Sequence, residues 1–142
     1  MTRKLHRLAL ALIALALMLP AASGAQPVPQ MHQGFIWTYN KTGYKIWITI
    51  YDLGKTQHLD YGMVEPHDAR KWTHCCYLLG SHYHVRGEVI DPKTDKHVFD
   101  TTMEVTPHLC YGMDGIPQPV VGVELRQGTG ESFYWQEADV YC

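Results

Sequence analysis

Apolar and polar residues alternate with a period of two along most of the chain after residue 33, and no long window has helical periodicity. In Tyr44–Tyr51, three isoleucines share one face, whereas Trp47, Thr49 and Tyr51 share the other. Because both faces are apolar or aromatic, this segment is predicted to be a central strand. Ser81–Ile90 is the longest alternating stretch, with apolar residues on one face and polar residues on the other.

Eight such segments, separated by turn residues, are predicted to be strands. They are Gly34–Tyr39, Tyr44–Tyr51, Thr56–Tyr61, Ala69–Thr73, Ser81–Ile90, His97–Val105, Val120–Arg126 and Ser132–Gln136. Asn40–Gly43, Asp91–Lys96 and Gln127–Gly130 are predicted hairpin turns, and Leu109–Pro119 is a predicted loop. The expected fold is all-β: a single antiparallel β-sandwich of about seven or eight strands, immunoglobulin-like in general architecture, with a small β-barrel as the alternative. The core is predicted to contain Ile46, Ile48, Ile50, Val85, Val89 and Val121.

The N-terminus is typical of a secretory signal peptide spanning residues 1–25. Basic residues precede the apolar run Leu8–Leu19, and small residues precede a cut after Ala25. Residues 26–33, which include Pro27 and Pro29, are expected to form an extended lead-in to a β-sandwich domain at 34–142. This arrangement predicts a secreted or periplasmic protein with no stable membrane insertion after cleavage.

The charge balance becomes more acidic once residues 1–25 are removed. Three of the 12 basic residues lie in that segment, whereas all 14 acidic residues follow it. A net negative surface argues against nucleic acid as a partner.

Four cysteines follow the signal peptide, which in an exported protein predicts two disulfides. A bridge between the neighbours Cys75 and Cys76 is the least favoured pairing, because it needs a distorted backbone. Both other pairings join these two cysteines to Cys110 and Cys142, and the sequence does not choose between them.

No complete catalytic motif is present, which favours a non-enzymatic role. The only serines after the signal peptide, Ser81 and Ser132, lie outside any nucleophile-elbow pattern. There is also no phosphate-binding glycine loop and no His-Glu-x-x-His motif.

The leading metal-binding candidate is formed by His82, His84 and Glu88, which an extended strand places on one face. Two imidazoles and a carboxylate suit a Zn or Cu ion. The run His-x-His-x₃-Glu resembles the first metal motif of the cupin family, small β-barrels that hold a metal ion inside, although the flanking glycines of that pattern are replaced here. The alternative is a solvated strand face, since Arg86 lies in the same row.

Three further patterns have possible chemistry. His74, Cys75 and Cys76 would suit zinc or copper if the thiols were reduced. Residues 56–63 and 106–113 agree at six of eight positions, which suggests either equivalent strand ends or a paired copper site from His58, His108, Met63 and Met113. Asn40-Lys41-Thr42 fits the N-glycosylation pattern.

The composition favours an exported, disulfide-stabilised binding module for a protein or glycan partner, with metal binding as the alternative. Four tryptophans and nine tyrosines exceed what a small core readily buries, and both residue types are common interface anchors. Trp37, Trp47 and Trp135 are nevertheless expected to lie in the core.

Overall fold

The computed structural model describes residues 24, 27, 29–74 and 77–142, so most of the predicted signal peptide and Cys75 and Cys76 lie outside it. The described part of the chain contains strands and no helix, and therefore no helix long and apolar enough to cross a membrane. The strands are β1 (Phe35–Asn40), β2 (Lys45–Asp52), β3 (His58–Val64), β4 (Ala69–Trp72), β5 (Tyr83–Ile90), β6 (His97–Val105), β7 (His108–Tyr111), β8 (Pro117–Gln127) and β9 (Phe133–Ala138).

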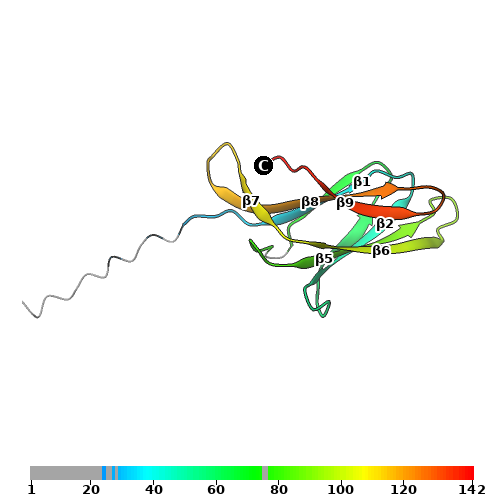
Figure 1. Cartoon of the computed structure of the whole chain (residues 1–142), viewed down its shortest axis with the longest axis horizontal. Coiled ribbons are helices and arrows are strands. Elements are labelled where there is room, and N and C mark those ends of the chain that lie inside the picture. The colour runs from blue at the N-terminus through cyan, green and yellow to red at the C-terminus, as the bar shows by residue number, and fades with distance from the viewer. Residues whose placement is uncertain (1–23, 25–26, 28, 75–76) are drawn as a thin grey trace, which may run out of the picture.

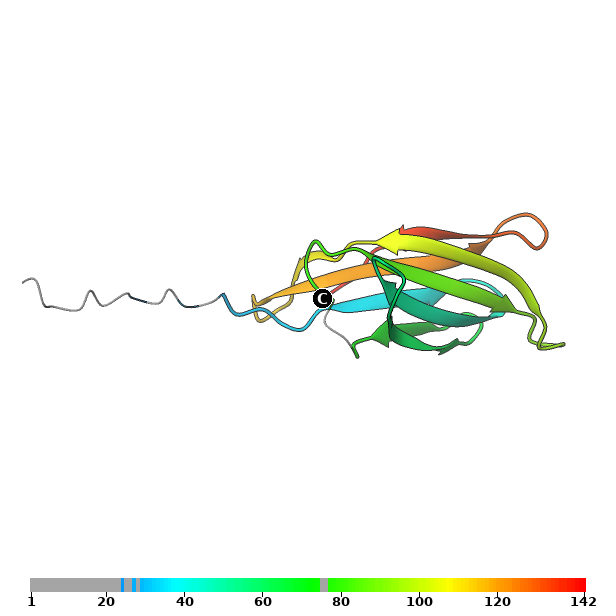
Figure 2. The same cartoon turned by 90° about the horizontal axis from the view of Figure 1, so that it is seen from below.

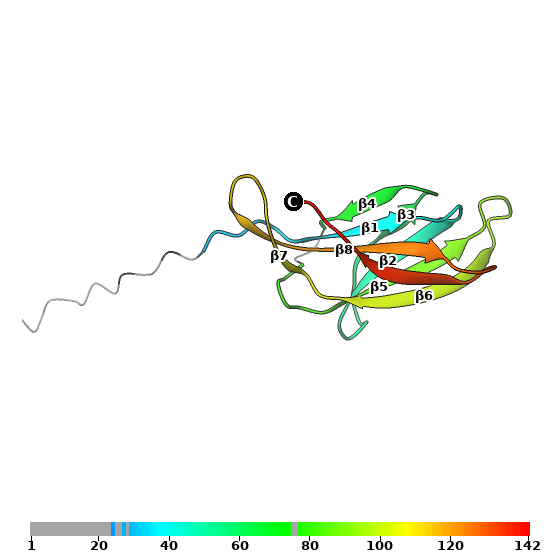
Figure 3. The same ribbon diagram turned by 45° about the horizontal axis from the view of Figure 1, so that its top comes forward.

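The strands form two sheets that pack face to face (Figures 1 and 3). One sheet has the order β3-β2-β5-β6, and the other has the order β4-β1-β8-β7 with β9 also paired to β8. The sheets do not close into a barrel, so the all-β sandwich prediction is confirmed and the barrel alternative is not. The predicted antiparallel pairing is confirmed for every described strand pair but one, since β1 and β8 run parallel.

The predicted hairpin between the first two strands is wrong. β1 pairs with β4 and β8, whereas β2 pairs with β3 and β5, so the turn at Asn40–Gly43 carries the chain from one sheet to the other. Alternation reports which face of a strand is buried, but it does not report the neighbouring strand. The hairpins β5–β6 and β8–β9 are confirmed, and β2 is central as predicted. Figure 2 shows the β5–β6 turn at the far end of the molecule from β7.

The predicted loop at Leu109–Pro119 contains ordered strand pairing instead. β7 pairs with the first residues of β8, and Leu109 and Tyr111 lie opposite Pro119 and Pro117. The prolines of this segment led to the loop prediction, because proline is uncommon within paired strands. They are tolerated because an antiparallel pair leaves alternate residues without a hydrogen bond to the partner strand, so a missing N–H costs little there.

The core lies between the inner faces of the two sheets and contains all six predicted residues. Ile46, Ile48, Ile50, Val85, Val89 and Val121 are each at most 2% exposed. Trp72 is also buried, and its indole Nε1 donates a hydrogen bond to Thr38 Oγ1 at 2.9 Å. Trp37 and Trp47 are only partly buried and lie on the outer faces of the sheets, because the buried residues Ile36 and Ile46 precede them on the inner faces.

Side chains bridge the sandwich at both of its long edges. Trp135 of β9 fills the space above Gly87, where an added Cβ would lie 2.8 Å from the indole ring, and its Nε1 donates to Thr101 O at 3.4 Å. At the opposite edge, Arg70 of β4 donates to Met63 O of β3 at 3.3 Å. These contacts cover backbone groups that an open sheet edge would expose.

Candidate functional site

A hollow of about 580 Å³ lies on the outer face of the five-stranded sheet. Strands β1, β8 and β9 supply its floor, and the C-terminal segment supplies one wall. Glu124 and Arg126 point to this face because they alternate along β8 with Val123 and Leu125, which are buried in the core. The strand register then places Tyr39 and Gln136 on either side of Glu124. The lining residues are Tyr39, Lys41, Glu124, Arg126, Gln136, Glu137, Ala138, Asp139 and Tyr141.

A carboxylate held in a fixed position forms the centre of this hollow. The side chain of Glu124 is 10% exposed, and its Oε1 accepts a hydrogen bond from Arg126 Nε at 2.6 Å. The amide of Gln136 donates to the same oxygen. Burial raises the pKa of Glu124, but these hydrogen bonds and the charges of Arg126 and Lys41 outweigh it, so that the pKa stays below its ordinary value. Glu124 is therefore ionised at neutral pH.

The second carboxylate oxygen of Glu124 is accessible from the hollow. Both hydrogen bonds of this side chain end on Oε1. Among the described residues, no buried side-chain oxygen or nitrogen lacks a hydrogen-bond partner, so Oε2 must reach solvent. The hollow therefore offers an oriented, charged acceptor.

Tyr39 lies beside this carboxylate and is held by its strand neighbours. Its ring stacks on Trp37 with centroids 5.8 Å apart, and the ammonium of Lys41 lies 5.5 Å from the ring centre. Burial and the charge of Glu124 both raise the pKa of the Tyr39 hydroxyl. The hydroxyl stays protonated at neutral pH and remains a hydrogen-bond donor.

A disulfide anchors the wall of the hollow. Cys142 is paired with Cys110 of β7, and their Cα atoms are 6.0 Å apart. The tail packs closely on the sheet between them, because a Cβ at Gly122 would lie 2.4 Å from Val140 Cγ2. The predicted bridges from Cys110 and Cys142 to Cys75 and Cys76 are therefore wrong. The positions of the cysteines in the sequence did not indicate that β7 and the C-terminal tail both lie against β8.

The three metal-binding candidates, His82, His84 and Glu88, each have a different partner and do not meet. His82 Nδ1 lies 2.8 Å from Glu104 Oε1, and His84 Nε2 lies 3.2 Å from Leu53 O. Glu88 Oε1 lies 3.3 Å from the guanidinium of Arg86. An extended strand advances about 3.3 Å per residue, so positions 82 and 88 are separated by roughly 20 Å. A shared face therefore does not provide a shared ligand position.

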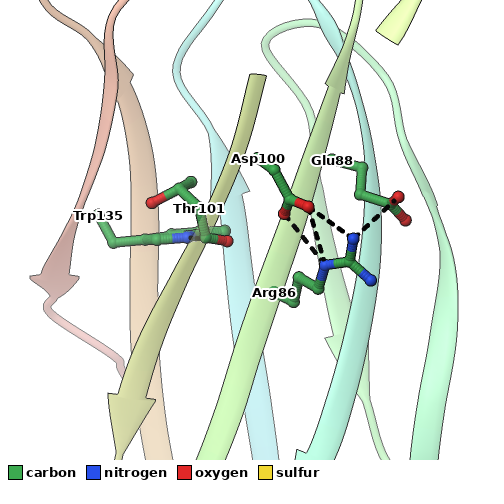
Figure 4. Close-up of polar contacts among 5 residues, drawn as sticks. All are labelled: Arg86, Glu88, Asp100, Thr101 and Trp135. Carbon is green, nitrogen blue, oxygen red and sulfur yellow. Dashed lines mark hydrogen bonds and ion pairs between the residues drawn. The ribbon is translucent and has the colours of Figure 1, made fainter. Parts of the chain in front are cut away.

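Glu88 instead approaches two residues of β6. Potential ligand atoms of Glu88, His97 and Asp100 lie within 4.8 Å of one another. Figure 4 shows the guanidinium of Arg86 between the carboxylates of Asp100 and Glu88. Arg86 Nη2 lies 2.5 Å from Asp100 Oδ2, and this interaction holds the pKa of Asp100 below its ordinary value. The guanidinium already pairs with both carboxylates that a metal ion would use.

We expect Arg86→Gln to raise the affinity for Zn²⁺ at least tenfold, because it releases the carboxylates of Glu88 and Asp100. Adding His97→Ala should reverse the gain. Isothermal titration of the metal-free protein with Zn²⁺ measures both effects. A His82→Ala/His84→Ala variant should match the unmodified protein, and loss of Zn²⁺ binding in that variant would contradict this description of the site.

The remaining sequence candidates are not assembled by the described residues. His58 lies in β3 of one sheet and His108 in β7 of the other, and Met113 is fully exposed. Of the predicted site at His74, Cys75 and Cys76, the two cysteines lie outside the described residues. The backbone N–H of His74 donates a hydrogen bond to Asp60 Oδ2 at 3.1 Å. Asn40 is 1% exposed, and its side-chain amide nitrogen donates hydrogen bonds to Tyr44 O and Glu65 O. The amide that would carry a glycan is therefore inaccessible in the folded protein.

None of the residues at the centre of the hollow was predicted from the sequence to be a site residue. Glu124 and Arg126 are separated by one residue on a predicted strand, and Gln136 lies on its predicted hairpin partner. That spacing is the one sequence feature that could have indicated a polar cluster here. It does not indicate the hollow, because the hollow also needs the parallel neighbour β1 and the tail.

The fold and this hollow define a small all-β sandwich with a Cys110–Cys142 disulfide and a polar site on one sheet. Comparison of the sequence with models of known protein families and with curated proteins found no match.

Proposed function

We propose that the protein is an exported, non-enzymatic binding module whose ligand enters the hollow between β1, β8, β9 and the tail. The observation that supports this most is the ionised Glu124, nearly buried and fixed through Oε1. Isolating a charge from water costs free energy unless its environment compensates, so such groups are concentrated at functional sites. A concave surface with a few oriented polar groups is the usual form of a ligand site.

The export part of the proposal is supported by the sequence of residues 1–25 and by the disulfide. Disulfides persist in oxidising compartments, and reducing conditions inside cells disfavour them.

A non-enzymatic role is supported by the ionisation of the carboxylate in the hollow. Glu124 is already paired with Arg126, and its pKa is lowered, whereas a general acid at neutral pH would need a raised pKa.

The proposal is tested by screening the purified, oxidised protein on an array carrying neutral glycans, acidic glycans, and basic and acidic peptides. We expect binding to one of these classes, with at least a tenfold loss in Glu124→Gln. This substitution keeps the size of the side chain but replaces the accessible acceptor. Glu104→Gln is the matched control, since Glu104 lies on β6 of the other sheet. Absence of binding to every class, or equal binding by both variants, would refute the proposal.

A further inference from the structure

We infer that the ligand of this hollow is an uncharged sugar, presented as part of a glycan chain. The inference rests on the proposed function and specifies its ligand class. It follows from three properties of the lining residues: the mixture of hydrogen-bond donors and acceptors, the balance of charge, and the aromatic rim.

The polar groups in the hollow require a ligand that donates and accepts at adjacent positions. Glu124 Oε2 can only accept a hydrogen bond, whereas the ammonium of Lys41 can only donate. The Tyr39 hydroxyl, protonated at neutral pH, adds a further donor. A hydroxyl group is the common neutral group that donates and accepts at once. Neighbouring hydroxyls on a sugar ring therefore match this arrangement.

The charges around the hollow disfavour ligands of either sign. Two basic residues, Lys41 and Arg126, face three acidic ones, Glu124, Glu137 and Asp139. An anionic ligand would meet an excess of carboxylates. A cationic ligand would have to approach Glu124 beside Arg126 and Lys41, whose charges already stabilise that carboxylate. A neutral ligand avoids both repulsions and needs only hydrogen bonds.

The rim of the hollow provides an apolar surface for the ring carbons of a sugar. Tyr141 lines the hollow and is 91% exposed, so its ring is free to contact a ligand. Aromatic rings combine a large apolar face with modest entropy loss on ordering. The disulfide at the next residue, Cys142, anchors the tail that carries this ring, and the ring lines the same hollow as Glu124 and Gln136. A volume of about 580 Å³ suits a short segment of a glycan chain.

The test compares three oligosaccharide probes of equal length that differ in charge. They are the hexamer of N-acetylglucosamine, which is neutral, the hexamer of glucosamine, which is cationic, and hexagalacturonate, which is anionic. Neutral hexamers of glucose and of mannose are titrated beside them. Isothermal titration of the oxidised protein should detect binding of at least one neutral hexamer, with both charged hexamers at least tenfold weaker.

Two variants locate the binding. Glu124→Gln and Tyr141→Ala should each weaken the neutral hexamer at least tenfold, whereas Glu104→Gln should not change it. Urea unfolding of each variant verifies that it is folded. If the array finds a Glu124-dependent ligand but no neutral hexamer binds, or a charged hexamer binds as tightly, the sugar inference fails and the binding function stands. If no ligand of any class depends on Glu124, both fail.

Discussion

Replacing Asn40 with alanine is expected to lower the free energy of unfolding by about 3–5 kcal/mol. The side chain lies at the end of β1, where the chain crosses between the sheets. Its Nδ2 donates to Tyr44 O at 2.7 Å and to Glu65 O at 2.9 Å. Its Oδ1 accepts from Thr42 N at 3.0 Å and from Thr42 Oγ1 at 2.8 Å. Alanine would leave several buried backbone groups without partners, each costing about 1–3 kcal/mol.

Urea unfolding followed by tryptophan fluorescence measures the effect, and two neighbouring variants serve as controls. Thr42→Ala keeps the amide donors of Asn40, and we expect it to cost less than half as much. Lys41→Ala alters an exposed side chain and should change stability by no more than about 0.5 kcal/mol. Both Asn40→Ala and Thr42→Ala remove the glycosylation motif, so a difference between them cannot arise from a glycan. Equal stability of Asn40→Ala and the unmodified protein would contradict this role.

Removing the disulfide with Cys110→Ser/Cys142→Ser is expected to cost about 3–4 kcal/mol. The two cysteines are 32 residues apart, and closing a loop of that length restricts the unfolded chain by an amount of this order. The same change releases the tail, so the wall that carries Tyr141 should no longer be held against β8. We therefore expect loss of both stability and ligand binding.

Peptide mapping without reduction tests the pairing directly. A fragment linking Cys110 to Cys142 should be recovered from the unmodified protein. The Cys75→Ser/Cys76→Ser variant is the matched control, and it should yield the same linked fragment. Recovery of Cys110 joined to Cys75 or Cys76 would overturn the pairing and the account of the wall.

Local patterns predicted the strands and the core well, because alternation depends only on which face of a strand avoids water. The isoleucines of β2 and the valines of β5 are buried as their spacing predicts. Turn residues located the β5–β6 and β8–β9 hairpins, since their strands are joined directly. The candidate site was not predictable in the same way. The spacing of polar residues such as His82, His84 and Glu88 predicts which face of a strand their side chains occupy. A ligand site requires side chains from several strands to meet at one place, and that spacing does not predict such a meeting.

The sequence by itself determined that this chain is an all-β protein with these segments as strands and these apolar residues as its core. Only the tertiary structure decided that β1 pairs with β8, that Asn40 joins the sheets, and that Cys110 bonds Cys142. The physical reason is the range of the interactions. Burial of a strand face is a local property of its residues. The hollow around Glu124 instead needs β1, which is far from β8 in the chain, to pair with β8, and it needs the tail to be held beside the β8–β9 hairpin.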